Sequence, residues 1–141
     1  MIYVDTSVMV AAIIPEQASE RVRGWLEKQS ADDLSVSDWT VTEFSSALSI
    51  KMRSGRLAID DRNTVLEAFS RIVEESFERF RVERADFTAA ARFAERHDLG
   101  LRAGDALHVA IAIANGTRLA TLDKTLAKAA TAAGVNCILL K

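Results

Sequence analysis

Short apolar runs with the length of buried strands alternate along this chain with longer segments whose apolar residues recur at helical spacing. The strand-like runs are residues 2–4, 34–36, 80–82, 119–122 and 135–140. The helical patterns cover 6–14, a segment opening at Pro15, 39–53, a segment opening at 60–61, 85–97, 107–114 and 124–133. This alternation favours an α/β fold with a mostly parallel sheet covered by helices on both faces.

The 141 residues show no internal repeat and no linker, so we expect a single domain spanning 1–141. Residues 56–80 carry two charged helical patterns and are expected to project from the sheet. No run is long enough to span a bilayer, and no signal-peptide pattern opens the chain. The lone Cys137 fits a reduced core residue, and we therefore expect a cytoplasmic location.

The formal net charge of −2 excludes a protein that holds nucleic acid by bulk positive charge. It leaves room for local basic patches, or for a site whose positive charge comes from a bound metal. Two histidines and one cysteine cannot build a usual structural zinc site. Any metal ligands in this chain would therefore be oxygens.

Four of the twenty acidic residues interrupt apolar segments where strands or loops meet helices. They are Asp5, Glu43, Asp105 and Asp123. In open α/β sheets, ligands bind beyond the carboxyl ends of the strands, where these residues are expected to meet. Each of the four also has a plainer explanation. Asp5 and Asp123 fit helix N-caps, and Glu43 fits a capping box with Thr40. Asp105 would lie in a first helical turn, where the helix dipole favours an acidic residue.

Carboxylates brought together repel one another unless a cation lies between them, and carboxylate oxygens suit Mg²⁺ or Mn²⁺. The pattern therefore favours a divalent-metal site over four separate caps. Ser7 and Thr121 each lie two residues from one of these aspartates and can bond a carboxylate or a metal-bound water, although both are also ordinary turn or strand residues.

The aromatic and histidine side chains carry a weaker signal. His108 lies one helical turn after Asp105, where it is either a packed, hydrogen-bonded residue or a general base. Trp25 and Trp39 fit apolar helical faces, so we interpret them as core or interface residues and not as platforms for stacked bases.

The stretches VDTSV, TVTEFSSAL, RAGDALHVAIA and LATLDKTL together resemble the PIN-domain family, and most closely its VapC-type toxins. The resemblance covers essentially the whole chain and follows the family's motif order. It implies a three-layer α/β/α sandwich and a metal-dependent endoribonuclease that uses one or two Mg²⁺ or Mn²⁺ ions. Asp5, Glu43, Asp105 and Asp123 would form the family's acidic quartet, with Asp5 and Asp105 as the foremost ligands and Ser7 and Thr121 as supporting hydroxyls.

The resemblance also implies an RNA substrate, a homodimer and a cognate antitoxin whose peptide enters the active groove. Candidate contacts to the RNA backbone are basic residues near the motifs: Lys51, Arg53, Arg56, Arg102, Lys124 and Lys128. For each of these residues, a solvated helix end is the alternative.

Three other interpretations stay open at this stage. A haloacid-dehalogenase-like phosphatase would use Asp5 as nucleophile, but it needs a second aspartate where this chain has Ser7. A receiver-type binding module needs an acidic pair after the first strand and a lysine at the end of a late strand. In this chain Asp5 stands alone, and the late strand 119–122 is followed by Asp123. A catalytically silent member of the PIN fold is the third, and the intact quartet argues against it.

Overall fold

The computed structural model describes residues 1–141 and contains one sheet of five parallel strands in the order β3-β2-β1-β4-β5. The strands are β1 (Ile2–Val4), β2 (Leu34–Ser37), β3 (Glu78–Phe80), β4 (Arg118–Thr121) and β5 (Cys137–Leu139). The helices are α1 (Thr6–Ile13), α2 (Ser19–Leu26), α3 (Asp38–Arg53), α4 (Arg62–Ser76), α5 (Arg84–Glu95), α6 (Ala103–Ala114) and α7 (Lys124–Ala132), with short 3-10 turns η1 (Ala31–Asp33) and η2 (Ile59–Asp61). The predicted α/β class with a parallel sheet is confirmed.

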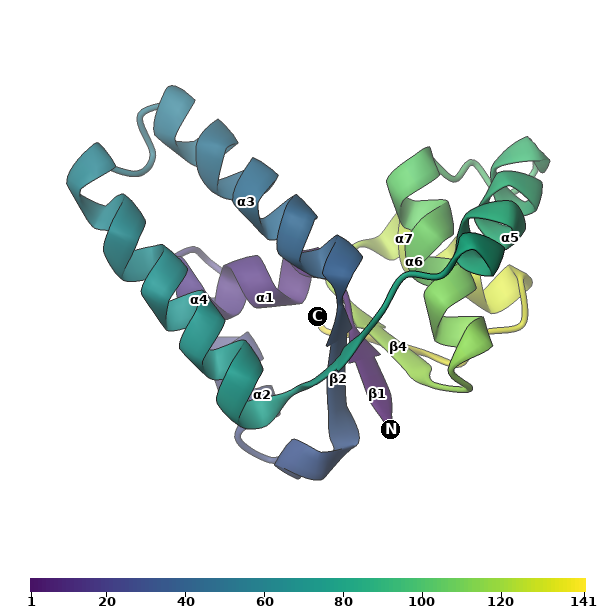
Figure 1. Ribbon diagram of the computed structural model, residues 1–141, viewed down its shortest axis with the longest axis horizontal. Helices are drawn as coiled ribbons and strands as arrows, with labels where there is room; N and C mark the ends of the chain where they lie inside the picture. Colours follow the sequence, from purple (N-terminus) through teal and green to yellow (C-terminus); the bar gives the residue numbers. More distant parts are fainter.

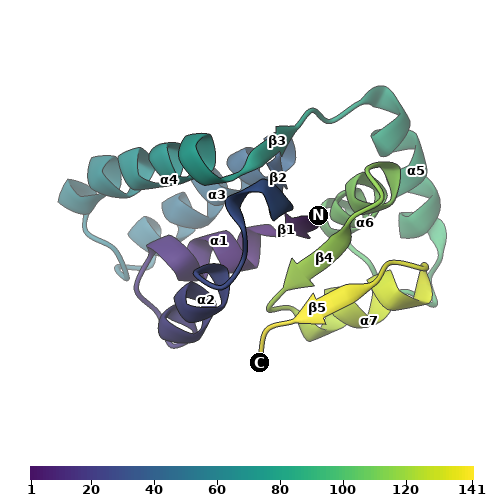
Figure 2. The same ribbon diagram turned by 90° about the horizontal axis from the view of Figure 1, so that it is seen from below.

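Helices cover both faces of the sheet, and the central strand β1 supplies side chains to both cores. Ile2 and Val4 pack with α1 to α4, whereas Tyr3 packs on the opposite face with α5, α6 and α7. Figure 2 shows the sheet lying between these two groups of helices. Strands buried on both faces read as continuous apolar runs, which is why the run at residues 2–4 predicted β1.

The chain winds from β1 to β2 and β3 on one side, and then returns to place β4 and β5 on the other. The reversal at β1 and β4 is the point of an open α/β sheet where ligands usually bind. Main-chain pairing aligns Tyr3 with Leu119 and Val4 with Ala120, so the two carboxyl ends lie side by side.

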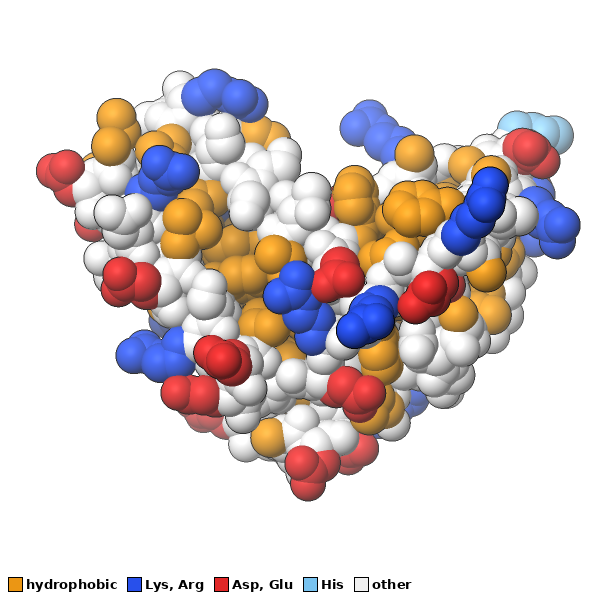
Figure 3. All heavy atoms as spheres, viewed as in Figure 1, with side chains coloured by type: hydrophobic (Ala, Val, Ile, Leu, Met, Phe, Trp, Pro, Cys, Tyr) orange, Lys and Arg blue, Asp and Glu red, His pale blue; other side chains and the backbone are white.

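Helices α3 and α4 form an arm that extends beyond the sheet (Figure 1). Phe44 and Phe69 join the two helices with rings stacked 3.9 Å apart. The expected projection of residues 56–80 is therefore confirmed for α4, whereas the end of that stretch becomes β3 at the sheet edge. Figure 3 shows a hollow between this arm and the α5–α6 side. No helix combines the length and the apolar content that a bilayer crossing requires.

Three expected element boundaries are wrong. Pro15 does not open a helix, because Ser19 closes a turn there by accepting from the Glu16 amide and donating to the Ile14 carbonyl, and α2 begins only at Ser19. The third strand lies at 78–80 and not at 80–82, because β3 is an edge strand with exposed charged residues that an apolar pattern misses. Helix α6 also begins earlier than the apolar run that predicted it, at Ala103.

Candidate active site

Asp5 follows the central strand β1 and is both a helix cap and the most firmly held carboxylate of the chain. Its Oδ1 accepts from the Ser7 hydroxyl at 2.6 Å and from the Val8 amide at 3.2 Å, which caps α1. Its Oδ2 accepts from the Thr121 hydroxyl of β4 at 2.6 Å. Burial raises the pKa of Asp5, and the influence of His108 and these hydrogen bonds only partly offsets the effect of burial. The capping and site explanations of Asp5 are thus compatible.

Asp123 is tied to Asp5 through the same threonine. The Thr121 hydroxyl accepts from the Asp123 amide at 2.9 Å while it donates to Asp5. Asp123 Oδ1 accepts from the amides of Thr125 and Leu126 and so caps α7, while its Oδ2 makes no hydrogen bond with the protein. The predicted supporting roles of Ser7 and Thr121 toward a carboxylate are therefore seen in the geometry.

Glu43 does not close a capping box, contrary to the plainer explanation of its position. That box at the start of α3 is formed by Ser37 and Thr40. Glu43 Oε1 instead accepts from the Thr6 hydroxyl at 2.6 Å and hydrogen bonds to Nε2 of His108 on α6. Glu43 is thus turned toward the end of β1, where Asp5 lies.

His108 is 2% exposed and links Glu43 to the core. Its Nδ1 lies 2.7 Å from the hydroxyl of Tyr3, which in turn lies 2.7 Å from the Ser37 hydroxyl. The packed, hydrogen-bonded interpretation of His108 is confirmed, but its partner is an acidic residue of the site. Burial opposes ionisation of Glu43, yet the hydrogen bond and the electrostatic influence of His108, with the Thr6 bond, lower its pKa.

Asp105 lies in the first turn of α6 and makes no hydrogen bond with another protein side chain. Burial raises its pKa, and the charges of Asp123, Glu43 and Asp5 raise it further against the opposing influence of His108. All four acidic residues singled out in the sequence therefore share one electrostatic neighbourhood. Thr6 and Tyr3 belong to the same network but were not predicted.

No three Asp, Glu, His or Cys side chains stand close enough together to form a ready-made metal site. The donor chemistry nevertheless fits Mg²⁺ or Mn²⁺, because Asp105, Oδ2 of Asp123 and Oε2 of Glu43 accept no hydrogen bond from the protein. Magnesium is commonly held by one or two carboxylates and keeps several of its waters. The buried Asp5 adds negative charge beside these oxygens.

The predicted basic contacts fall into two groups. Arg102 is the N-cap residue of α6 and Lys124 directly follows Asp123, so both adjoin the acidic site. Lys51, Arg53 and Arg56 lie at the far end of α3 and just beyond it, roughly 12 Å or more along the helix from Glu43. Lys51 is bound to Glu16 at 3.2 Å, which leaves it less available than the sequence suggested.

The fold and site together define an α/β protein with a carboxylate-rich site at the carboxyl edge of a parallel sheet. The family model of the PIN domain matches residues 2–132, and the chain therefore belongs to the PIN-domain family. This match confirms the family expected from the motifs and argues against the phosphatase and receiver-module interpretations. Among curated proteins, none matches the chain in sequence.

Several solved structures share the fold. FitAcB from Neisseria gonorrhoeae is 24% identical, with a TM-score of 0.73 and coverage of 98% of this chain and 96% of that chain. VapC20 from Mycobacterium tuberculosis, described as a sarcin–ricin loop cleaving toxin, is 18% identical, with a TM-score of 0.71 and 96% coverage of both chains. VapBC2 from Rickettsia felis, solved with a fragment of promoter DNA, is 16% identical, with a TM-score of 0.67 and full coverage of both chains.

Proposed function

We propose that this protein is a metal-dependent endoribonuclease that acts as the toxin of a toxin–antitoxin pair. Membership of the PIN-domain family supports a nuclease. The structural neighbours include toxin–antitoxin complexes and a toxin that cleaves an RNA loop, which supports the toxin role and the RNA substrate.

One observation carries the proposal: Asp105 has a carboxylate without a hydrogen-bonding partner, beside three other carboxylates that raise its pKa. Such an arrangement is costly unless a cation is shared among the charges. Helix capping explains one oxygen of Asp123 and one of Asp5, but it does not explain why Asp105 lies where the charges of Asp123, Glu43 and Asp5 raise its pKa.

The acidic quartet Asp5, Glu43, Asp105 and Asp123 would hold one or two Mg²⁺ or Mn²⁺ ions, with Asp5 and Asp105 as the principal ligands. When bound, such an ion makes water more acidic and neutralises charge on the phosphodiester. The chain's own residues orient the ligands: Ser7 and Thr121 fix the Asp5 carboxylate, and Thr6 and His108 fix that of Glu43.

The RNA backbone would contact Arg102 and Lys124 beside the acidic site, and a longer strand would continue toward Arg53 and Arg56 at the end of α3. We also propose a cognate antitoxin, a homodimer and a cytoplasmic location. An antitoxin lysine or arginine would be attracted to the acidic site and would compete with the metal there.

The test is RNA cleavage by the purified protein with and without Mg²⁺ or Mn²⁺, compared with the Asp5→Asn variant. We expect cleavage that depends on the metal, is stopped by a chelator and is lost in Asp5→Asn while the circular dichroism spectrum is unchanged. Asp61→Asn, an exposed aspartate at the far end of the α3–α4 arm, is the matched control and should cleave normally. Cleavage that persists in excess chelator, or in purified Asp5→Asn, would refute the metal mechanism.

A further inference from the structure

A chain of hydrogen bonds leaves helix α3 at its N-cap and returns to the same helix at Glu43. It starts at the Ser37 hydroxyl, which lies 2.7 Å from the hydroxyl of Tyr3 on β1. The Tyr3 hydroxyl also lies 2.7 Å from Nδ1 of His108 on α6, and Nε2 of His108 hydrogen bonds to Oε1 of Glu43. Three elements, β1, α3 and α6, are therefore joined at the acidic residue Glu43.

The bond between His108 and Glu43 is the only side-chain hydrogen bond between α6 and α3. Helix α3 carries Glu43, and α6 carries Asp105 one turn before His108. The two helices also approach closely at Gly104, where a Cβ atom would lie 3.0 Å from Oε2 of Glu43. His108 is thus the link between Glu43 and the helix that bears Asp105.

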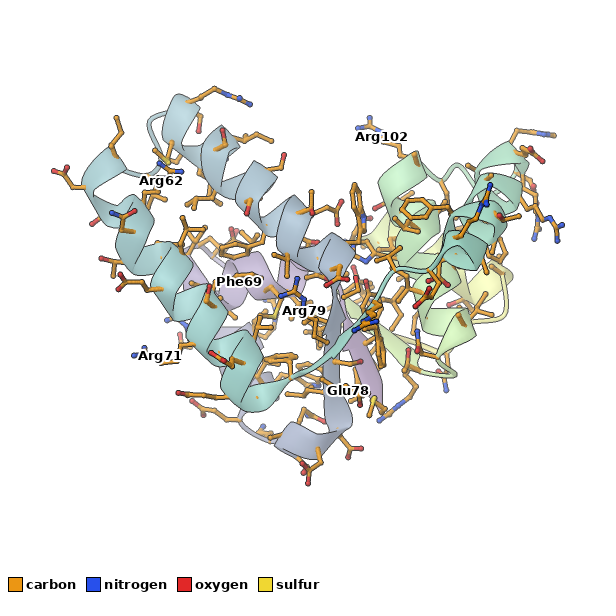
Figure 4. The ribbon with its side chains drawn as sticks, in the orientation of Figure 1. Arg62, Phe69, Arg71, Glu78, Arg79 and Arg102 are labelled. Carbon is orange, nitrogen blue, oxygen red and sulfur yellow. The ribbon has the colours of Figure 1, made fainter.

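No lysine or arginine of the chain pairs with Glu43. Arg79 is paired with another carboxylate at the start of α3, and Arg102 reaches away from the start of α6 (Figure 4). The Glu43 carboxylate therefore depends on two donors to Oε1, the Thr6 hydroxyl at 2.6 Å and Nε2 of His108. Its Oε2 accepts no hydrogen bond from the protein and is left for a ligand.

The chemistry of the groups fixes the direction of the bonds around His108. An ionised carboxylate only accepts, so Nε2 of His108 must donate to Glu43, and a neutral imidazole then has a bare Nδ1 that only accepts. Burial raises the pKa of Tyr3, so its hydroxyl keeps the hydrogen that Nδ1 needs. The opposite direction would require a second hydrogen on the ring and hence a charged imidazole at 2% exposure.

The cap of α3 points its hydrogen the same way. Oγ of Ser37 accepts from the Thr40 amide at 3.2 Å, which leaves the hydroxyl hydrogen free to be donated. Its nearest acceptor is the Tyr3 oxygen at 2.7 Å, since Oγ1 of Thr40 lies 3.3 Å away. The hydrogen bonds therefore run in one direction, from the cap of α3 through Tyr3 and His108 to Glu43.

We propose that Tyr3 is a positioning residue of the acidic site: its hydroxyl holds His108 as the Nε2–H tautomer, and His108 in turn orients Glu43 for the cation. This inference rests on the proposed function, in which Glu43 is a metal ligand. A histidine–tyrosine pair that served packing alone would not need to end on a carboxylate that is 27% exposed. Hydrogen-bond partners of metal ligands orient those ligands and strengthen metal binding.

The first test needs neither metal nor RNA. Nitrogen NMR of the metal-free protein with isotope-labelled histidine, at about pH 8, where an ordinary histidine is neutral, reports which ring nitrogen carries hydrogen. We expect His108 to carry it on Nε2 alone, and Tyr3→Phe to shift the Nδ1 signal toward that of a nitrogen without a hydrogen bond. The exposed His97, the only other histidine, is the internal reference.

Mn²⁺ binding measures the effect on the acidic site. Tyr3→Phe should weaken binding by roughly tenfold, the lower end of the range for partners of metal ligands. His108→Leu should weaken it further, and adding Tyr3→Phe to His108→Leu should cause no additional loss, because the hydroxyl acts through the imidazole. His108→Gln, whose amide can donate to Glu43, should bind Mn²⁺ more tightly than His108→Leu.

Ser35→Ala is the matched control for Tyr3→Phe. Ser35 pairs with Tyr3 across the sheet, is fully buried and donates its hydroxyl to the Ile2 carbonyl at 3.1 Å. The substitution therefore removes a buried hydroxyl beside the hydrogen-bond chain but not from it. It should leave Mn²⁺ binding and the His108 signals unchanged, even if it lowers the melting temperature as Tyr3→Phe does.

The proposal is overturned if Nδ1 of His108 carries a hydrogen in the unaltered protein. It is also overturned if folded Tyr3→Phe binds Mn²⁺ as tightly as the unaltered protein, or if Ser35→Ala weakens binding equally, since the Tyr3 hydroxyl would then serve packing alone. If the unaltered protein binds no Mn²⁺, the proposed function fails, and the NMR signals still confirm or refute the control of His108 by Tyr3.

Discussion

The two halves of the acidic site are held in different ways. Asp5 and Glu43, on the β1–α3 side, are fixed by hydroxyl, amide and imidazole groups from three separate segments of the chain, α1, β4 and α6. Asp105, at the start of α6, has no such partner, and its pKa is raised by burial and by the surrounding carboxylates. Asp123 stands between the two cases, with one oxygen engaged in capping α7 and the other free.

This difference indicates which carboxylates the protein already orients and which one has no partner until a ligand binds. The fixed carboxylates have their desolvation offset by hydrogen bonds inside the protein. The unpartnered carboxylate is a cost that the fold alone does not offset, as is common where function opposes stability. Variants on the two sides should therefore differ in their effects on activity and on stability.

The largest expected effect is on activity, at the unpartnered carboxylate. Asp105→Asn keeps the side-chain shape but removes the charge, and should lower metal-stimulated cleavage more than about 100-fold, because even changes in the partners of metal ligands cost roughly 10- to 100-fold. Cleavage rates at saturating Mn²⁺ measure the effect. A loss of only a few fold would show that Asp105 is not a ligand.

A smaller effect is expected from a residue that only orients a ligand. Thr121→Val removes the hydroxyl that donates to Asp5 Oδ2 and should weaken metal affinity or activity by roughly 10- to 100-fold. Thr125→Val is the matched control, since Thr125 is exposed in the first turn of α7 and its hydroxyl makes no hydrogen bond. Equal metal affinity and activity in the two variants would show that the Thr121 hydroxyl does not position Asp5 for the metal.

Metal affinity should also depend on pH. The raised pKa values of Asp5 and Asp105 mean that both hold protons at a pH where ordinary aspartates are ionised, and a proton competes with a cation for the same oxygens. As pH falls, Mn²⁺ affinity should decline well before about pH 4, the range of an unperturbed aspartate. Calorimetric titrations across the acidic range measure this, and a decline confined to the ordinary aspartate range would contradict the raised values.

The smallest expected effects are on stability. Substituting Asp105 should stabilise the protein, whereas substituting Asp123 should destabilise it. Asp105→Asn removes a repelled, partly buried charge and should raise the melting temperature in a chelator. The raised pKa means that the folded state binds the Asp105 proton more tightly than the unfolded state does. As pH falls through the folded pKa, protonation of Asp105 therefore stabilises the unaltered protein. The difference in melting temperature between Asp105→Asn and the unaltered protein should shrink in that pH range.

Asp123→Ala removes the cap of α7 and should instead destabilise the protein by about 1 kcal/mol. Thermal unfolding of both variants in a chelator tests the comparison. A lower melting temperature for Asp105→Asn would mean that its carboxylate stabilises the fold.

The sequence was sufficient to predict the parallel sheet from its apolar strands and to place Asp5 and Asp123 directly after two of them, whereas the ligand role of the four acidic residues stays a prediction. It could not predict the links from His108 to Glu43 and Tyr3, which join residues separated by 65 and 105 positions. The pattern also failed at β3, where an edge strand has no apolar signature, and at Pro15, where a side-chain turn delays α2. The interpretation of Trp39 as a core or interface residue agrees with the structure, where Trp39 is half-buried and packs against the core that contains Tyr3.

The most direct test of the central claim is Mn²⁺ binding, followed by the electron paramagnetic resonance signal of the free ion. We predict that the unaltered protein removes that signal at one or two ions per chain, and that Asp105→Asn, while folded, does not. Equal binding by the two proteins, or no binding by either, would contradict a shared cation at the carboxyl edge of the sheet.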